Sequence, residues 1–295
     1  TMLVSVIIPS YNYREYLEDA VDSVLSQTFK DFEIIIVDDG SKLEVYQFVE
    51  EVAQRDERIQ LFSHKHRQNK GLSETIQLGI NKSKGEWICI LEADDLWRHD
   101  CLERRIELIS QEVSILVNDL NPILMNADSD SWFRGYVPRV MTQLNFRQRK
   151  KTPFQVSDLM MWENVFPTFS AVMFRKSLAQ RVNWKTPVRG WTDWFVWAQM
   201  SQDARVSYCP DKLTHWRLHS DSQNSKKAGL KTYLQEYSYF RKALYDELKK
   251  NGRHDSRIVP LRLPSIVPLG RRAFLSVKQI GIKSFLESVF QRLKH

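Results

Sequence analysis

The stretch WICILEADD, residues 87–95, passes directly from five apolar residues into a run with three carboxylates, and this arrangement sets the fold that we expect. An apolar run of this length is typical of a strand buried on both faces. Glu92, Asp94 and Asp95 repel one another unless a cation lies among them. Mg²⁺ and Mn²⁺ prefer such oxygen ligands and keep open positions for substrate phosphates. The alternative is an acidic turn that caps the following helix.

The same passage from an apolar strand into a polar cluster occurs twice earlier in the chain, at residues 10–12 and 38–41. Strands that alternate with helices predict an α/β fold with a mostly parallel sheet flanked by helices. Ligands bind beyond the carboxyl ends of such strands, so we expect the three clusters at one edge. The expected elements are strands at 3–8, 32–37, 59–62 and 87–91 and helices at 14–26, 43–54 and 72–83.

The second half of the sequence is less regular. Residues 126–153 are polar, basic and weakly periodic, which predicts a loop or an insertion. After about residue 226 the pattern is helical, with a break around Pro260, Pro264 and Pro268. Helices are expected at 155–163 and 193–202, and strands at 171–174 and 206–209.

Composition limits the classes of partner and compartment. The 295 residues carry a net charge of +7, which suits an anionic partner such as a nucleotide diphosphate, a phospholipid headgroup or an acidic polymer. We expect no nucleic acid, because no basic run with interleaved aromatics resembles a known module. Three widely spaced cysteines build neither a disulfide framework nor a zinc site, which indicates a cytoplasmic protein. We expect neither a signal peptide nor a membrane-spanning segment.

The two earlier clusters carry candidate nucleotide-binding groups. The Asp39 carboxylate can accept a base N–H or a ribose hydroxyl, while Gly40 permits a tight turn and Ser41 can cap the next helix. A plain strand-to-helix turn explains this cluster equally well. Tyr11 offers an aromatic face for a base, although packing in the core is equally open.

Taken together, these motifs resemble the family 2 glycosyltransferases of the GT-A fold. The resemblance is close over the first third of the chain, loose over the middle third and limited to one piece in the last third. It implies a GT-A catalytic domain over 1–225, with a nucleotide-sugar-binding half at 1–118 and an acceptor-binding half at 119–225, and a helical C-terminal extension at 226–295. The matching stretches are VSVIIPSYN at 4–12, AVDSVLSQT at 20–28, IVDDGS at 36–41, NKGL at 69–72 and GEWICILEADD at 85–95.

Carried over by position, the resemblance assigns a role to each matching residue. It implies an inverting transfer from a nucleotide diphosphate sugar, with UDP sugars the most frequent donors in the family. Asp94 would bind Mn²⁺ or Mg²⁺ with Asp95 beside it, and Glu92 stands where the family usually has an Asp. The implied donor-binding residues are Pro9, Tyr11, Asn12, Asp39, Asn69, Gly71, Glu92, Ala93 and Asp94.

Two further site residues come from the second half of the chain. The stretch GWTDWF at 190–195 resembles the family segment that supplies the general base, which makes Asp193 the candidate. The alternative is that Asp193 only caps its helix, and Thr192 stands where the family often has an acid. His219 resembles a family position that completes the metal site or contacts the diphosphate, and a purely structural role is the alternative.

Apolar residues at helical spacing over 274–293, with basic residues around them, predict an amphipathic C-terminal helix. Such a helix either lies on the inner face of a membrane or packs on the catalytic domain or on another subunit. Peripheral membrane contact would suit a lipid-linked acceptor, and a homo-oligomer is one open alternative.

The sequence therefore predicts a metal-dependent inverting glycosyltransferase that moves a sugar to a glycan or lipid-linked acceptor, as in bacterial surface polysaccharide synthesis. One rival is a sugar nucleotidyltransferase, which would carry a Gly-rich basic loop where residues 10–13 read SYNY. The other is a non-catalytic carbohydrate-binding or scaffold GT-A domain, and the joint presence of the acidic residues argues against it. The sequence disfavours a Rossmann dehydrogenase, because no Gly-x-Gly-x-x-Gly follows an early strand.

Overall fold

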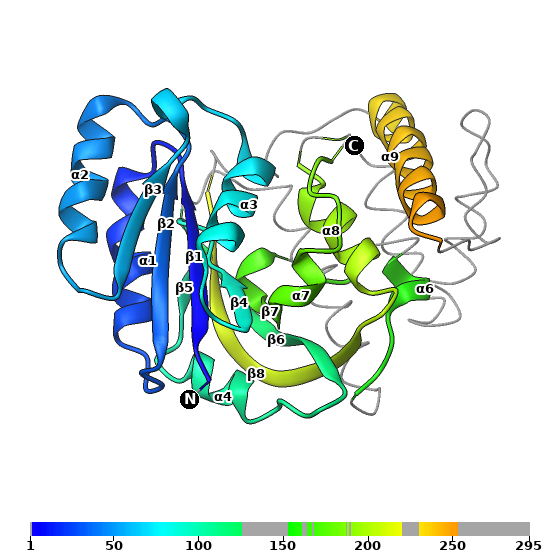
Figure 1. Ribbon diagram of the computed structural model, residues 1–295, viewed down its shortest axis with the longest axis horizontal. Helices are drawn as coiled ribbons and strands as arrows, with labels where there is room; N and C mark the ends of the chain where they lie inside the picture. The colour runs from blue at the N-terminus through cyan, green and yellow to red at the C-terminus, as the bar shows by residue number, and fades with distance from the viewer. Residues whose placement is uncertain are drawn as a thin grey trace.

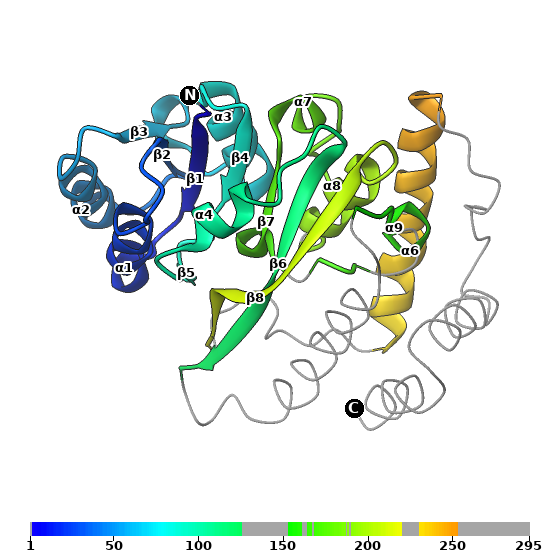
Figure 2. The ribbon, with the colours of Figure 1, turned by 90° about the horizontal axis from the view of Figure 1, so that it is seen from below.

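The computed structural model describes residues 2–125, 153–160, 164–166, 168–186, 188, 190–219 and 230–252. Within them, an eight-stranded sheet has the order β3-β2-β1-β4-β7-β6-β8-β5, with helices on both faces (Figures 1 and 2). The strands are β1 (Val4–Ser10), β2 (Phe32–Asp38), β3 (Ile59–Ser63), β4 (Trp87–Ile90), β5 (Leu96–Trp97), β6 (Val113–Leu124), β7 (Val172–Arg175) and β8 (Arg205–Leu218). The α-helices are α1 (Arg14–Leu25), α2 (Leu43–Ala53), α3 (Leu72–Lys82), α4 (Cys101–Ile106), α6 (Ser157–Met160), α7 (Lys176–Ala179), α8 (Thr192–Met200) and α9 (Leu230–Lys250); the 3-10 turns are η1 (Lys65–Arg67) and η2 (Phe169–Ala171).

The first four strands confirm the expected parallel α/β unit. Strand β1 pairs in parallel with β2 and β4, and β2 pairs in parallel with β3. Alternate residues of β1 enter different cores: Val6 lies in the cluster with α1, α2 and α4, whereas Ile7 lies in the cluster with α3 and α8. Apolar side chains are therefore needed on both faces, which explains the nearly continuous apolar runs.

The second half makes the sheet mixed, because β7 runs antiparallel between β4 and β6. Strands β6 and β8 form a long parallel pair with register shifts, and β5 closes the sheet antiparallel to β8. The strands expected at 171–174 and 206–209 are present, although β8 continues to Leu218. Strands β5 and β6 were not among the expected elements.

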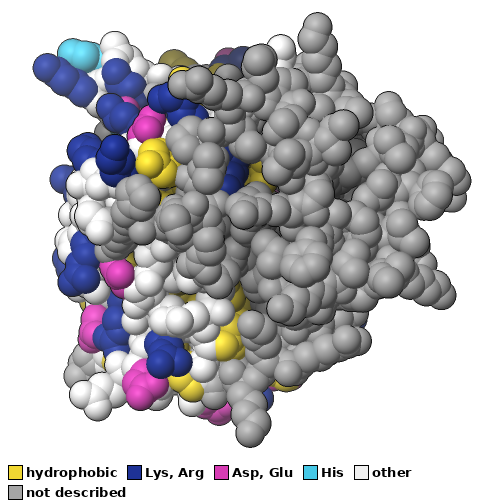
Figure 3. All heavy atoms as spheres, turned by 90° about the vertical axis from the view of Figure 1, so that its right-hand side faces the viewer, with side chains coloured by type: hydrophobic (Ala, Val, Ile, Leu, Met, Phe, Trp, Pro, Cys, Tyr) yellow, Lys and Arg dark blue, Asp and Glu magenta, His cyan; other side chains and the backbone are white. Residues whose placement is uncertain are grey.

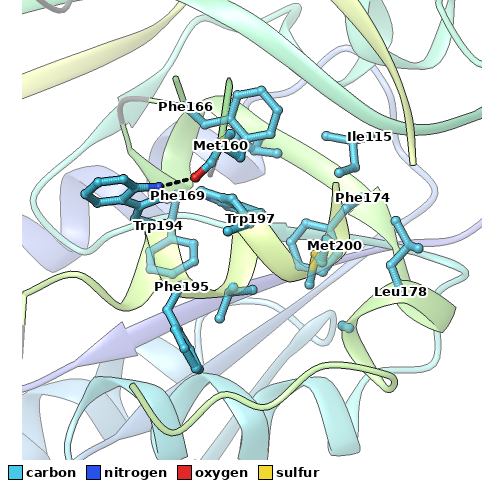
Figure 4. Packing of buried hydrophobic residues seen from close by; sticks show 14 of the residues in the cluster. Ile115, Met160, Phe166, Phe169, Phe174, Leu178, Trp194, Phe195, Trp197 and Met200 are labelled. Atoms are coloured by element: carbon cyan, nitrogen blue, oxygen red, sulfur yellow. Dashed lines mark hydrogen bonds between the residues drawn. The ribbon is translucent and has the colours of Figure 1, made fainter. Parts of the chain in front are cut away.

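The aromatic part of the cluster that contains Ile7 joins α8 to the described part of the C-terminal region (Figure 4). Trp197 is fully buried among Phe166, Phe169 and Phe174, and the indole N–H of Trp194 donates to the backbone oxygen of Met160 at 2.7 Å. Helix α9 packs on this core, with the rings of Trp194 and Phe240 4.6 Å apart. The proposed boundary at 225 stays a prediction.

Several expectations fall wholly or partly outside the described residues. These are the loop at 126–153 up to residue 152, the end of the helix at 155–163, the three prolines at 260–268 and the amphipathic helix at 274–293. Among the described helices, none combines the length and apolar character needed to cross a bilayer. In the described part of the face shown in Figure 3, Lys and Arg side chains gather along the left side, with Asp and Glu side chains scattered among them.

Candidate active site

The carboxyl ends of β1, β2 and β4 lie side by side, as the sequence predicted. Asn12, which follows β1, links the first two ends: its N–H donates to Ser41 Oγ at 2.9 Å, and its Oδ1 accepts the N–H of Lys42 at 2.9 Å. Asn12 adopts a left-handed φ of 58° to make this link. The N–H of Leu91 donates to Ile7 O at 2.9 Å, which places the start of the acidic run beside β1.

The two aspartates at the end of β2 have different partners. Asp38 closes its own turn, because its Oδ2 accepts the N–H groups of Gly40 at 3.0 Å and Ser41 at 3.1 Å. Asp39 reaches the start of α3, where Oδ1 accepts the N–H of Lys70 at 2.6 Å and Oδ2 accepts that of Gly71 at 2.9 Å. Asp39 therefore fixes the entrance to α3.

A glycine is required at position 40, since the loop before α3 packs directly on it. A Cβ atom there would lie 2.6 Å from Arg67 O and 2.7 Å from Asn69 N, and its φ is +78°. Tyr11, in contrast, is 47% exposed, which argues against the core-packing alternative and leaves its ring available to a ligand. Pro9 is buried at the end of β1, and Asn69 is exposed.

The acidic run is held by the turn η2 and by β8. The N–H of Glu92 donates to Ser170 Oγ at 3.0 Å, and the Glu92 carboxylate accepts the hydroxyl of Thr168. Asp95 is buried, and its Oδ1 accepts the N–H of Arg217 at 3.1 Å. The Ala93 side chain lies in the core, so only its backbone is available to a donor.

Carboxyl groups are crowded together at this end of the sheet. Burial raises the pKa of Glu92 to about 8, with the charge of Asp94 adding to the effect. Burial and the charges of Asp94 and Glu92 also raise the pKa of Asp95 well above its usual value. The Arg217 guanidinium is directed to Asp19, at 3.0 Å, and to the backbone oxygens of Tyr16 and Asp94. These carboxylates favour an added cation.

The expected metal ligands are brought together only in part. Asp94 Oδ2 lies 3.1 Å from His219 Nε2, whereas the Asp95 carboxylate faces the backbone of β8. Among the described residues, no group of three His, Cys, Asp or Glu side chains has the arrangement of a metal site. Two protein ligands still fit a divalent ion that takes its remaining ligands from substrate phosphates and water. The imidazole favours Mn²⁺ over Mg²⁺.

Asp193 lies in the first turn of α8, where its Oδ1 accepts the backbone N–H of Trp194 at 2.7 Å, so the helix-capping alternative stays open beside the general base. The N-cap residue is Trp191, and Asp193 Oδ2 accepts the amide of Asn164 at 2.7 Å. Burial raises the pKa of Asp193 to about 6. Its charge also raises the pKa of Glu92, so the two carboxylates belong to one electrostatic site. Helix α8 meets α3 where Thr192 Oγ1 lies 3.4 Å from Ser73 Oγ.

Two kinds of site residue were missed. Thr168, Ser170 and Asn164 contact the acidic groups, yet the sequence shows them only as ordinary polar residues ahead of β7 and α8. The basic segment HKHR at 64–67 predicts that His64 and His66 both lie on the solvated surface, and this prediction is wrong for His64. Its side chain is only 11% exposed and contacts Asp39 and Thr75, because β3 ends directly beneath α3.

The fold and the site together define a transferase of the nucleotide-sugar class. The family model described as glycosyl transferase family 2 matches residues 5–182, so the chain belongs to this family. An uncharacterized glycosyltransferase of Nostoc sp. is 27% identical over 249 residues, covering 80% of this chain and 70% of that protein. A putative teichuronic acid biosynthesis glycosyltransferase of Bacillus subtilis, TuaG, is 37% identical over 109 residues, covering 37% of this chain and 42% of that protein. A Rickettsia bellii glycosyltransferase is 32% identical over 145 residues, covering 47% of this chain but only 20% of that protein.

Solved structures of similar fold agree with this assignment. TarS of S. aureus in complex with UDP-GlcNAc has a TM-score of 0.61 at 16% identity, over 99% of this chain and 89% of that chain. The mannosyltransferase PcManGT of Pyrobaculum calidifontis, in complex with GDP-Man and Mn²⁺, has a TM-score of 0.55 at 16% identity, over 98% and 86%. At such identities the likeness establishes the fold, which is GT-A.

Proposed function

We propose that this protein is a metal-dependent inverting glycosyltransferase that moves a sugar from a UDP sugar to a hydroxyl of a glycan or lipid-linked acceptor. The proposed setting is bacterial surface polysaccharide synthesis. The name of the B. subtilis relative supports that setting, and the UDP-GlcNAc in the S. aureus structure supports the donor class. The GDP-Man in the archaeal structure makes GDP sugars the donors to test alongside.

The observation that carries the proposal is the Asp193 carboxylate, with its pKa raised to about 6 beside the acidic run. A general base works best when its pKa is near the working pH, since it is then ionised and still basic. In the proposed step, Asp193 takes the proton of the acceptor hydroxyl as that oxygen forms a bond to the anomeric carbon. The bond from this carbon to the diphosphate oxygen breaks, and the nucleoside diphosphate leaves.

The chain also offers groups for the donor. Asp94 Oδ2 and His219 Nε2, 3.1 Å apart, would hold the divalent ion. When bound, the ion supplies positive charge against the diphosphate leaving group. Tyr11, which is 47% exposed, offers a stacking face for the base, and Asp39 offers carboxylate oxygens for a base N–H or a ribose hydroxyl.

A thermal-shift screen of nucleotide sugars, with MnCl₂ or with EDTA, tests the donor, because a ligand that binds the folded state raises its melting temperature. The anomeric configuration of the product, followed by NMR, tests inversion. Retention of configuration would exclude the single displacement through Asp193. Release of pyrophosphate from UTP and a sugar phosphate would favour a nucleotidyltransferase. Binding without turnover of any acceptor would favour the scaffold domain.

A further inference from the structure

His64 occupies a position that neither the metal ligands nor the general base explains. It follows β3 directly, and its side chain is 11% exposed. Its Nε2 lies 3.0 Å from Thr75 Oγ1 and 3.5 Å from Asp39 Oδ1. The Thr75 hydroxyl donates to Gly71 O at 3.0 Å, so it accepts from His64, and the hydrogen-bond network places the imidazole proton on Nε2.

The three groups around the Asp39 carboxylate leave it little freedom. Oδ1 accepts the N–H of Lys70 and faces His64 Nε2, and Oδ2 accepts the N–H of Gly71. The hydrogen bonds from Lys70 and Gly71 fill two of the roughly four acceptor positions of a carboxylate, and His64 Nε2 lies 3.5 Å from Oδ1, so the position on Oδ2 stays open to a ligand. The imidazole therefore affects the orientation of the Asp39 carboxylate, and with it the direction of the acceptor position on Oδ2.

The loop between His64 and α3 is itself fixed at the same edge. The Arg67 guanidinium donates to Ser41 O at 2.8 Å and lies 4.1 Å over the ring of Tyr46. Gly40 allows the backbone at Arg67 to approach closely. These contacts hold the loop above His64 in place. We therefore expect a substitution of His64 to change the orientation of Asp39 rather than the position of the loop.

We propose that His64 is a positioning residue for nucleotide recognition: its Nε2–H, held between Thr75 and Asp39, fixes the Asp39 carboxylate in the orientation that receives the nucleoside of the donor. This inference rests on the proposed function, because it assumes that Asp39 contacts the nucleotide. The chemistry of the ligand is that of a nucleoside diphosphate with an N–H or O–H donor at its nucleoside end.

The test measures UDP binding in the presence of MnCl₂ by calorimetry, with GDP in parallel, using the full chain. His64→Asn shortens the side chain so that its amide falls short of Asp39, whereas His64→Gln keeps a donor near the position of Nε2. We expect roughly tenfold weaker UDP binding for H64N, equivalent to about 1.4 kcal/mol, and recovery to within about twofold of wild type for H64Q. His66→Asn is the matched control: His66 is exposed, its φ is 57°, and Asn tolerates this conformation.

Melting temperatures measured without ligand separate positioning from folding, and Thr75→Val provides a second route to the same contact if H64N does not fold. We expect T75V to weaken UDP binding too, since Thr75 aligns the imidazole. Wild-type affinity in H64N, or a loss in H64Q as large as that in H64N, would overturn the inference. A wild-type protein that binds neither UDP nor GDP would instead overturn the proposed donor class, and the role of His64 with it.

Discussion

Asp94 Oδ2 lies 3.1 Å from His219 Nε2, although 125 residues separate them in the sequence. The contact joins the segment after β4 to the end of β8. The Arg217 guanidinium stabilises it, since it reaches Asp19 and the backbone oxygens of Tyr16 and Asp94. The buried imidazole packs 5.1 Å from the ring of Tyr16, which limits its rotation.

This pair predicts the metal dependence of the enzyme. Asp94→Ala and His219→Ala should each lower manganese-dependent transfer by about 10²–10³-fold, because a bound ion supplies several kcal/mol of charge stabilisation. The measurement is initial rate against MnCl₂ concentration. His215→Ala is the matched control: His215 lies on β8, just before His219, and its ring contacts Asn121 at 3.0 Å instead. Undiminished transfer by the Asp94→Ala enzyme in EDTA would contradict the metal proposal.

Asp193 predicts a pH profile and a separation of binding from turnover. Asp193→Asn should bind the donor like wild type and lose about 10²–10⁴-fold in transfer. The pKa of Asp193 is raised to about 6, and only the ionised form accepts a proton, so wild-type kcat should fall as the pH drops below about 6. The profile is measured with saturating donor and acceptor. A parallel loss of donor affinity in the Asn variant would show that Asp193 is not the base.

Asn164 provides an independent check on that profile. Its amide donates to Asp193 Oδ2 at 2.7 Å, and this hydrogen bond lowers the pKa of the carboxyl by favouring its charged form. Asn164→Ala should therefore move the acid limb of the pH profile to higher pH. Asn251→Ala at the end of α9, far from this carboxylate in sequence, should leave the limb in place. An unmoved limb in the Asn164 variant would mean that another group titrates.

The raised pKa of Glu92 predicts that ionisation of this carboxyl destabilises the metal-free protein. Its pKa is raised from 4.5 in the unfolded chain to about 8 in the folded protein, so the folded state binds more protons between these values. Its contribution to stability therefore falls as the pH rises from about 4.5 to 8. Glu92→Gln removes this loss. In EDTA at pH 8, its melting temperature should exceed that of wild type by about 2–4 °C for each kcal/mol of stability recovered. At low pH the two melting temperatures should converge.

Glu51→Gln, an exposed substitution on α2, controls for the general effect of removing one negative charge. The quantity to compare is the difference in melting temperature between variant and wild type at each pH. A difference that does not change with pH would show that Glu92 titrates normally in the folded protein.

The early strands could be predicted from the sequence. Each is buried on both faces, so its residues form a nearly continuous apolar run. Residues 32–37 and 87–91 are such runs, and β2 and β4 lie there. The long pair of β6 and β8 could not be predicted, since its partners are about 90 residues apart: Val117, for example, pairs with Tyr208. Long-range pairing leaves no local period in the sequence.

The site shows the same division. The placement of Asp39 and of the acidic run at one edge followed from the topology rule for parallel strands. The orientation of Asp95 did not, because it depends on the backbone N–H of Arg217, which carries no sequence signal. His64 was misjudged because a basic segment, HKHR at 64–67, suggests solvent, although its first residue lies under α3.

The carbonyl oxygen of Ser170 accepts three donors, from Trp97 at 2.8 Å, Arg105 at 2.7 Å and Thr214 at 3.1 Å. The turn that holds Glu92 is thus anchored through a main-chain atom, which every amino acid supplies. The Ser170 side chain adds a second contact, because its Oγ accepts the N–H of Glu92 at 3.0 Å. A saturation mutagenesis library should therefore record its strongest defects at Arg105 and at proline substitutions near position 170, with milder ones for small side chains there.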